Sequence, residues 1–558
     1  MKTHFCCLLL LCLVALPGRG YAPRPSAPTT QRLATLGRVW GLLKYYHPGL
    51  ASGQRNWDSV LVATLPPAQQ ARSRAQWKRV LTAMCDAAGP LPAGLAAAAP
   101  TGPAPAWLQQ DKRVPPALRT RLTSLVQHYQ PHDNVYVTKH YKGNVLSQPL
   151  FIGEKPYEQP ASPAAEYRLL ALFRFWNAIE YYYPFKAGMG TDWLRVLPRY
   201  LPDFAAETDT LRYHQLGQRL AAELRDSHAN ATSPVLDRQR ATATVPFAAI
   251  CLGEQLVVSR LLADSLAAAA NLRAGDIITH LDGQPAAKAR ARLRPFVSGS
   301  TPGALERDLT QLLLNGPLGS RLRLTVRRGT ETIQTSVGRY AYKDIQRGGR
   351  YGSKRPAKPA WEILPSGVGY VRAAAVKSAA ADQLMAQLHA APAIIFDMRG
   401  YPDYRLGAQL ARHLYPAGVP SELSEEVDAR QPSRTLVVPD TARRAPATFP
   451  LYTGQVLVLV NESTQSAAEG FVMTLQAYPR TRTVGSTTAG ANGNQTFITL
   501  PGDLTISFSG VVIKYPDGTP TQRHGVRIDV PVRPTAAGLA AGRDEVLEKA
   551  LRLVATAQ

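Results

Sequence analysis

The sequence predicts a multidomain α/β protein with a duplicated helical N-terminal region, a β-rich middle module and a C-terminal core of alternating strands and helices. Three observations predict it. The 558 residues exceed what one hydrophobic core supports. A helical pattern occurs twice in the first third of the chain, and from about residue 360 short apolar runs alternate with helical patterns. Such alternation indicates a sheet covered by helices.

The first 22 residues are typical of a secretory signal peptide. Lys2 precedes an apolar stretch over 5–16, and small residues follow up to Ala22. The stretch is too short to span a bilayer, and Cys12 lacks the small preceding residues of a lipid-anchor site. We therefore expect an exported protein, periplasmic or extracellular, that is soluble after signal cleavage.

Lysine and arginine number 64 against 40 acidic residues, for a formal net charge of +24. The basic residues are scattered, with local clusters only at 290–295 and 346–358, and no nucleic-acid-binding motif accompanies them. The charge is best explained as solvated surface, so no nucleic-acid partner is expected. Peripheral attraction to anionic envelope surfaces or acidic peptides stays open.

Of five cysteines, only Cys85 and Cys251 remain after the signal. Neither has a His or Cys companion at ligand spacing, so we expect no metal and no cofactor. Two free thiols are favoured, although an oxidising compartment would also permit a disulfide.

The segments 32–48 and 168–184 align without gaps, with Trp40 on Trp176 and, further along, Trp57 on Trp193. Apolar residues recur at helical spacing in both, so each is an amphipathic helix that ends at its proline. The aromatic residues are expected to pack. The expected divisions are a first copy at 23–141, a Pro/Gly-rich linker at 142–164 and a second copy at 165–235.

Residues 245–340 alternate short β patterns with turns. The run "NLRAGDIITHLDGQPA" (271–286) resembles the PDZ module, in which a Gly-Asp turn leads into a strand and an Asp-Gly hairpin. Such modules bind extended peptides or free C-termini by adding a strand to a sheet edge.

The region 360–558 carries the α/β pattern. Strands are expected at 367–373, 393–400 and 455–460, and helices at 379–389, 404–415, 466–478 and 542–554. The apolar strand 455–460 leads through "NEST" to "SAAEGFVM", which starts a helix at Ser466.

In their order and spacing, "DMRG", "VNESTQSAAEGF", "VGSTTAG" and "GVRIDVPV" resemble the serine peptidases that include the C-terminal processing (tail-specific) proteases and the tricorn core. The resemblance covers roughly residues 165–558. It implies a peptidase core with Ser466 as nucleophile, polypeptide substrates and no cofactor.

The tail-specific branch takes its base from a lysine at the position of Ala491, and alanine cannot accept a proton. The tricorn-like branch uses a histidine placed before the PDZ-like module, which corresponds here to His228 after Ser227. Neutral imidazole can take a serine proton near neutral pH. The resemblance implies that Ser227 and a glutamate orient this base, but the glutamate position holds the uncharged Gln522.

By the same resemblance, the backbone N–H groups of Gly400 and Ala467 form the oxyanion hole. The loop after Gly400 departs from the family's glycines, since it continues with Tyr401-Pro402-Asp403. Glu469, in the first turn of the helix after Ser466, is expected to be structural.

Two interpretations of each feature stay open at this point. Ser466 is a nucleophile or a helix N-cap, and His228 is a base or a histidine placed by a helix end. The protein is accordingly an exported serine endopeptidase or a catalytically weak or inactive relative that binds peptides. Ala491 and Gln522 favour the second, whereas Ser466, Gly400 and the Ser227-His228 pair favour the first.

Overall fold

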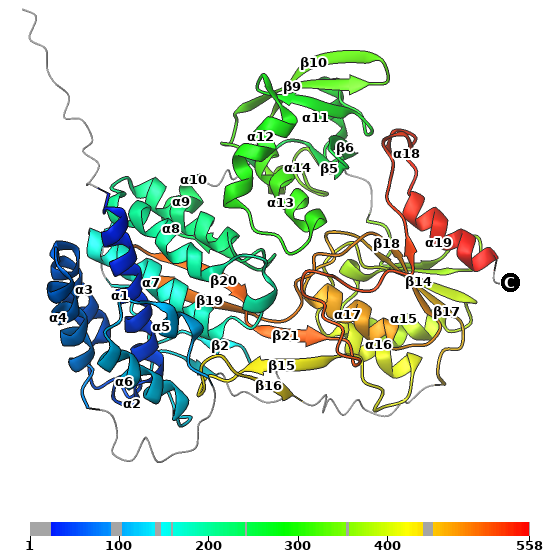
Figure 1. Ribbon diagram of the computed structural model, residues 1–558. Helices are drawn as coiled ribbons and strands as arrows, with labels where there is room; N and C mark the ends of the chain where they lie inside the picture. The colour runs from blue at the N-terminus through cyan, green and yellow to red at the C-terminus, as the bar shows by residue number, and fades with distance from the viewer. Residues whose placement is uncertain are drawn as a thin grey trace, which may run out of the picture.

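The structure is a computed structural model of the chain. It describes residues 24–90, 103–139, 147–157, 160–239, 243–352, 357–438 and 450–556. The expected signal peptide at residues 1–22 lies outside these ranges. Figure 1 shows a mixed α/β protein with a helical part (blue to cyan), a β-rich module (green) and an α/β part (yellow to red).

The helical part contains two sets of helices. The first set is α1 (Ala27–Tyr46), α2 (Pro48–Ala51), α3 (Trp57–Gln70), α4 (Arg74–Asp86), α5 (Ala106–Gln110) and α6 (Pro116–Gln127). The strands β1 (Thr138–Lys139) and β2 (Pro149–Leu150) precede the second set, α7 (Ala165–Tyr182), α8 (Trp193–Ala206) and α9 (Thr210–Ala222). Within the described residues, no helix combines the length and apolarity needed to cross a bilayer.

The two aligned tryptophan pairs make the same contacts. Trp40 donates its indole N–H to the Trp57 carbonyl at 3.1 Å, and Trp57 returns the bond at 2.9 Å. Trp176 and Trp193 repeat this exchange at 2.9 and 3.0 Å. Each pair therefore locks the first helix of its set onto the second, and the aromatic residues pack as expected.

Helices α1 and α7 cross closely. A Cβ on Gly41 would lie 1.9 Å from the side chain of Asn177, so only glycine fits there. Asn177 donates to the Gly37 carbonyl at 3.0 Å, which satisfies its buried amide. The sequence region expected to be the first copy thus packs directly against the second.

The β-rich module is a sheet in the order β10-β9-β7-β6-β5, with β8 paired to β7. Its elements are β5 (Phe247–Leu252), β6 (Gln255–Leu261), α11 (Asp264–Ala269), β7 (Ile277–Leu281), β8 (Gln284–Pro285), α12 (Ala286–Leu293), α13 (Pro302–Leu314), β9 (Arg321–Arg328) and β10 (Glu331–Gly338). Short segments flank it: β3 (Asn230–Thr232), α10 (Pro234–Gln239) and β4 (Ala243–Thr244) before, β11 (Tyr340–Ala341) and α14 (Tyr342–Ile345) after. Cys251 is half-buried on β5 and Cys85 is buried on α4, and both thiols are free.

The α/β part is built on a sheet in the order β12-β13-β14-β17-β18-β22, parallel except for β12. Its strands are β12 (Trp361–Ile363), β13 (Gly369–Arg372), β14 (Ala393–Asp397), β17 (Gln455–Val460), β18 (Thr481–Gly485) and β22 (Val530–Pro531). Its helices are α15 (Ala381–Leu388), α16 (Leu406–Leu414), α17 (Ala467–Gln476), α18 (Ala536–Ala540) and α19 (Glu545–Ala555). The loops after β14, β17 and β18 leave the same sheet edge, because these strands are parallel.

Two further sheets join the α/β part to the helical part. One has the order β16-β15-β21, from β15 (Leu423–Val427), β16 (Thr435–Val438) and β21 (Val511–Lys514). The other has the order β19-β20-β3, from β19 (Gln495–Leu500), β20 (Leu504–Ser509) and β3.

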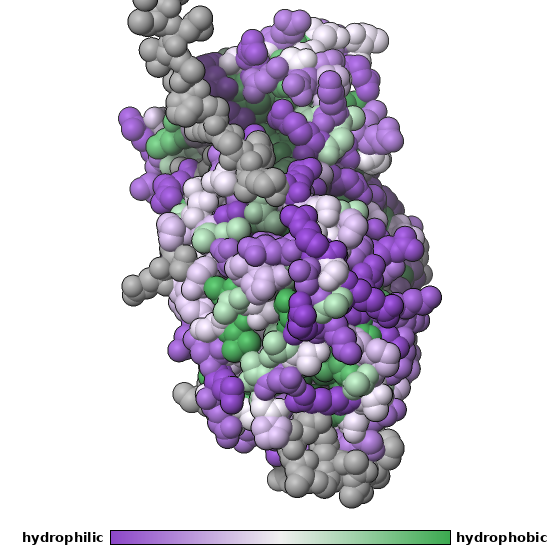
Figure 2. All heavy atoms as spheres, turned by 60° about the vertical axis from the view of Figure 1, so that its left-hand side comes forward, coloured by the Kyte–Doolittle hydropathy of each residue, from purple (hydrophilic) through white to green (hydrophobic). Residues whose placement is uncertain are grey.

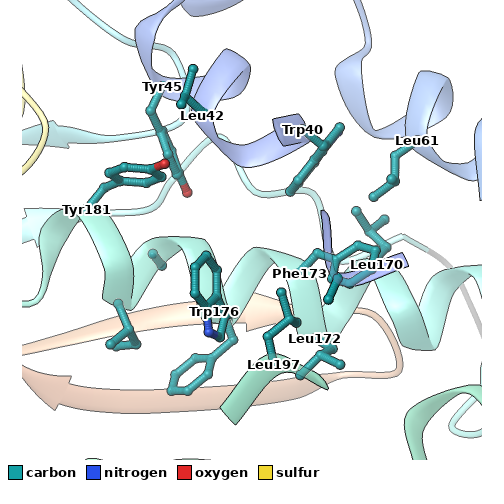
Figure 3. Close-up of a cluster of buried hydrophobic side chains, with 14 of the residues drawn as sticks. Trp40, Leu42, Tyr45, Leu61, Leu170, Leu172, Phe173, Trp176, Tyr181 and Leu197 are labelled. Carbon is teal, nitrogen blue, oxygen red and sulfur yellow. The ribbon is translucent and has the colours of Figure 1, made fainter. Parts of the chain in front are cut away.

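The β19–β20 hairpin belongs by packing to the helical part, although it lies within the predicted 360–558 core in sequence. Its apolar residues, including Phe508, share one buried cluster with α7. The rings of Phe175 and Phe508 lie 6.3 Å apart. Figure 3 shows Trp176 and Leu172 of α7 on the side that faces this pair of pale orange strands. The hairpin thereby carries a C-terminal segment into the N-terminal core.

On the face shown in Figure 2, hydrophilic side chains predominate and hydrophobic ones form small patches between them. This is the pattern of an ordinary solvated face. It agrees with the interpretation of the scattered basic residues as surface.

Candidate active site

Ser466 lies in the turn between β17 and α17, half-buried, with φ 57° and ψ −123°. A positive φ is uncommon for a residue with a side chain and costs about 1–3 kcal/mol where it is strained. An N-cap residue normally has extended backbone, as Ser73 does with φ −118° and ψ 160°. The backbone of Ser466 is instead that of a sharp strand-to-helix turn, which presents a serine hydroxyl at the end of a sheet.

Glu469 holds this turn. Its carboxylate is fully buried and accepts from the backbone N–H of Ser466 at 3.3 Å. It also accepts from three groups of the loop after β18: Thr488 Oγ1 at 2.6 Å, Gly490 N at 2.8 Å and Ala491 N at 3.0 Å. Burial raises the pKa of Glu469, and these donors oppose the shift. The expected structural role is thus specific, because Glu469 fixes Ser466 to the loop that contains Ala491.

His228 lies in the turn between α9 and β3, and only 4% of it is exposed. Its Nδ1 lies 3.0 Å from Ser509 Oγ, at the end of β20. Burial lowers the pKa of His228, and the positive charge of Arg307 lowers it further against the opposing effect of Asp226. The ring is therefore neutral near neutral pH, which is the state that a proton acceptor needs.

Ser466 and His228 line the same cavity, of about 400 Å³. A second cavity, of about 680 Å³, also opens on Ser466 and shares Tyr401 with the first. Ala374, Val376 and Ile513 contribute apolar walls to it. Ser466 therefore lines both cavities.

The Ser227 hydroxyl makes its hydrogen bonds to groups other than the ring of His228. Its hydroxyl donates to the Ala489 carbonyl at 3.2 Å and accepts from Ser300 N at 2.8 Å. Ser227 N in turn donates to Ser300 Oγ at 2.8 Å. The expected orienting contact is therefore replaced by one that joins the His228 turn to the β-rich module.

Gln522 does not orient His228 either. It is 5% exposed, and neither atom of its amide has a hydrogen-bond partner among the described residues. The expected contact fails because the Nδ1 side of His228 is occupied by Ser509, a residue that the sequence did not single out.

Gly400 lies in the loop between β14 and α16, and Ala467 follows the loop that leaves β17. Ala467 is the first residue of α17, so its N–H precedes the intrahelical bonds, and it lines the larger cavity beside Ser466. Neither amide donates to another of the described residues. Both N–H groups are thus available to a ligand oxygen.

Three parts of the chain meet beside Ser466. Gln465 Nε2 donates to the Ser227 carbonyl at 3.2 Å. Arg307, on α13 of the β-rich module, donates to Gln465 Oε1 at 2.9 Å and to the Glu462 carbonyl at 2.7 Å. Within the described ranges, no group of three or more His, Cys, Asp or Glu side chains is placed to hold a metal ion.

Two functional candidates were missing from the sequence interpretation. Asp226 precedes His228 by two residues and accepts its backbone N–H at 3.0 Å, a spacing that sequence reasoning had the means to notice. Ser509 reaches His228 from 281 positions away. No local sequence signal indicates that contact.

Comparison with known proteins places this site in a family. The model of peptidase family S41 matches residues 367–532, the segment that contains Gly400, Ser466 and the loop after β18. This α/β part of the chain is similar to peptidase family S41, a family of serine peptidases. The resemblance stated from the sequence motifs is therefore confirmed.

Solved structures extend the likeness beyond this segment. Mature CPAF complexed with lactacystin matches at a TM-score of 0.56 and 16% identity, over 70% of this chain and 98% of that one. The photosystem II D1 C-terminal processing protease matches at a TM-score of 0.41 and 21% identity, over 66% of this chain and 93% of that one. At these identities the likeness to CPAF shows a shared fold, and the lower-scoring match adds nothing to it. No curated protein sequence matches this chain significantly.

Proposed function

We propose that this protein is an exported serine endopeptidase that hydrolyses unfolded or C-terminally recognised polypeptides. The observation that carries the proposal is the pairing in one cavity of Ser466, in a strained strand-to-helix turn, with a buried neutral His228. The site belongs to the part of the chain that matches a serine peptidase family.

In this mechanism Ser466 Oγ attacks the peptide carbonyl carbon while His228 Nε2 takes its proton. The electron pair of the C=O π bond moves onto the carbonyl oxygen, and the N–H groups of Gly400 and Ala467 stabilise the resulting oxyanion. When the C–N bond breaks, His228 returns the proton to the leaving amine. Water then attacks the acyl-enzyme by the same proton route and regenerates Ser466.

The β-rich module supplies substrate binding in this proposal. Modules of the PDZ type bind a peptide by adding it as a strand to a sheet edge. The edge strand β5 packs beside α13, and Cys251 Sγ lies 3.5 Å from Thr310 Oγ1. Arg307 of α13 lines the Ser466 cavity. A peptide bound along β5 would therefore lie beside the helix that reaches the site.

The alternative function is peptide binding without catalysis, and the absence of a charged residue at Gln522 favours it. A serine-directed fluorophosphonate probe separates the two. The peptidase proposal expects labelling of the wild type and none of Ser466→Ala, together with cleavage of an unfolded casein substrate. A folded wild-type protein that neither reacts with the probe nor cleaves casein would leave peptide binding as the function.

A further inference from the structure

Asp226 is the acceptor at the centre of a buried hydrogen-bond network behind His228. Its Oδ1 accepts from His228 N at 3.0 Å and from Ser509 Oγ at 2.9 Å. Its Oδ2 accepts from Ser509 N at 2.8 Å and from the Tyr183 hydroxyl at 3.3 Å. Asp226 and Ser509 are both 0% exposed.

The network fixes the protons on the histidine ring. Four donors converge on the carboxylate, so Asp226 acts only as an acceptor. Ser509 must then give its single hydroxyl proton to Asp226. Its oxygen is left to accept at 3.0 Å from His228, which therefore carries its proton on Nδ1.

This tautomer leaves the lone pair of His228 on Nε2. That nitrogen makes no hydrogen bond with another described residue, while His228 lines the cavity that it shares with Ser466. The network thus prepares the one ring nitrogen that can take the Ser466 proton. Gln522, at the position where the resemblance implies a glutamate, has no charge and makes no side-chain hydrogen bond to the ring.

We propose that the Asp226 carboxylate, acting through Ser509, holds His228 in the tautomer that is protonated on Nδ1 and can accept a proton on Nε2. It also stabilises the doubly protonated imidazolium. The two are positioning residues, since neither touches the substrate. They reach His228 from segments 283 positions apart, Asp226 from the turn after α9 and Ser509 from the end of β20. This inference rests on the proposed peptidase function and assigns the charge that Gln522 does not supply.

The assignment has a consequence that a merely structural role lacks. The charged groups that act on His228 are Asp226, which raises its pKa, and Arg307 of α13, which lowers it. Asp226→Asn removes the negative charge of Asp226 and keeps the positive charge of Arg307. The midpoint of the rise of kcat/KM with pH should therefore move to lower pH, while kcat falls because the imidazolium loses its counter-charge.

The test uses Asp226→Asn, Ser509→Ala and, as a matched control, Gln522→Ala in the full mature chain. We expect the first two to lower the rate of fluorophosphonate labelling and kcat on casein by roughly 10- to 10⁴-fold, up to the contribution of a general base. KM should change little. Gln522→Ala should retain the wild-type rate and pH midpoint.

Wild-type rates and an unshifted pH midpoint in both folded variants would overturn the inference. If Asp226→Asn does not fold, Ser509→Ala decides the kinetic test, and ¹⁵N-histidine NMR of the wild type decides the tautomer. A His228 signal protonated on Nε2 rather than Nδ1 would refute the network. Failure of the peptidase proposal looks different, because the wild type itself would then lack labelling that depends on Ser466.

Discussion

Removal of the Glu469 carboxylate should loosen the turn that presents Ser466, and the size of the effect follows from its contacts. Glu469→Ala leaves the backbone N–H groups of Gly490 and Ala491 without an acceptor. It also removes one hydrogen bond of Ser466 N and one of the Thr488 hydroxyl. Ser466 N keeps its other bond, to the Ala491 carbonyl at 3.0 Å. A buried donor left unpaired costs about 1–3 kcal/mol. Two such donors together with a cavity predict a loss of about 4 kcal/mol in the free energy of unfolding.

Glu469→Gln is the matched variant. Its amide oxygen can replace Oε2 and keep the bonds to Ser466 N and Ala491 N, while its NH₂ group donates to the Thr488 hydroxyl. Gly490 N then loses its acceptor, and the Thr488 hydroxyl changes from donor to acceptor in this contact, so the expected cost is about 1–3 kcal/mol. Because the Ser466 bond survives, Glu469→Gln should still react with a fluorophosphonate, whereas Glu469→Ala should react much more slowly.

Urea unfolding measures the stability of both variants, and the labelling rate measures the turn. Glu548→Ala, on the solvent side of α19, controls for loss of a carboxylate and should change neither quantity appreciably. The reasoning fails if the free energy of unfolding of Glu469→Ala lies within about 1 kcal/mol of the wild-type value, since a single unpaired donor already costs that much. It also fails if both Glu469 variants label at the same rate.

The remaining predictions concern the proton transfer and the packing around it. Ser466→Ala should abolish casein cleavage and His228→Ala should reduce it nearly as far, because the two act as a unit; full activity in His228→Ala would refute the mechanism. Burial lowers the pKa of His228, so kcat/KM should rise with pH through a midpoint below about 6.5, the unperturbed value; a midpoint above it would contradict the burial argument. Gln522→Glu should lower the melting temperature without raising activity, because the new charge would be buried without a partner. Asp58→Asn should also lower the melting temperature, because the buried Arg174 pairs with Asp58 and Glu154 and would keep only the second carboxylate. An unchanged melting temperature would show that the ion pair of Asp58 with Arg174 is dispensable for stability.

The predictable part of the site is the part encoded in short stretches. The apolar run 455–460 coincides with β17, and the helix expected from residue 466 appears as α17, one residue later. Strand, turn and helix are fixed by neighbours in sequence, so their pattern is visible there. Gly400 and Ala467 were singled out by the family resemblance, on the short motifs that contain them.

The unpredicted part depends on contacts between distant segments. Nothing in "SFSG" (507–510) shows that a hairpin leaves the α/β part to pack on α7. The register of β20 against β3 then decides whether a hydroxyl meets His228, because Ser507 and Ser509 share one face of the strand and a one-residue shift would turn both away. Ser227 was singled out instead, because the family resemblance implies that it orients the base, but its hydroxyl and N–H group bond to Ser300.

The placement of Ser509 explains why the helical part is needed for catalysis in this proposal. His228 comes from the helical part and Ser466 from the α/β part, so their distance depends on how the two parts are joined. The β19–β20 hairpin makes that joint, because it starts and ends in the α/β part while its apolar face is buried among the helices. Its last residue, Ser509, bonds to both Asp226 and His228. The element that docks the two parts is therefore the one that orients the base, and a change that loosens the docking should also release the proton acceptor from its tautomer.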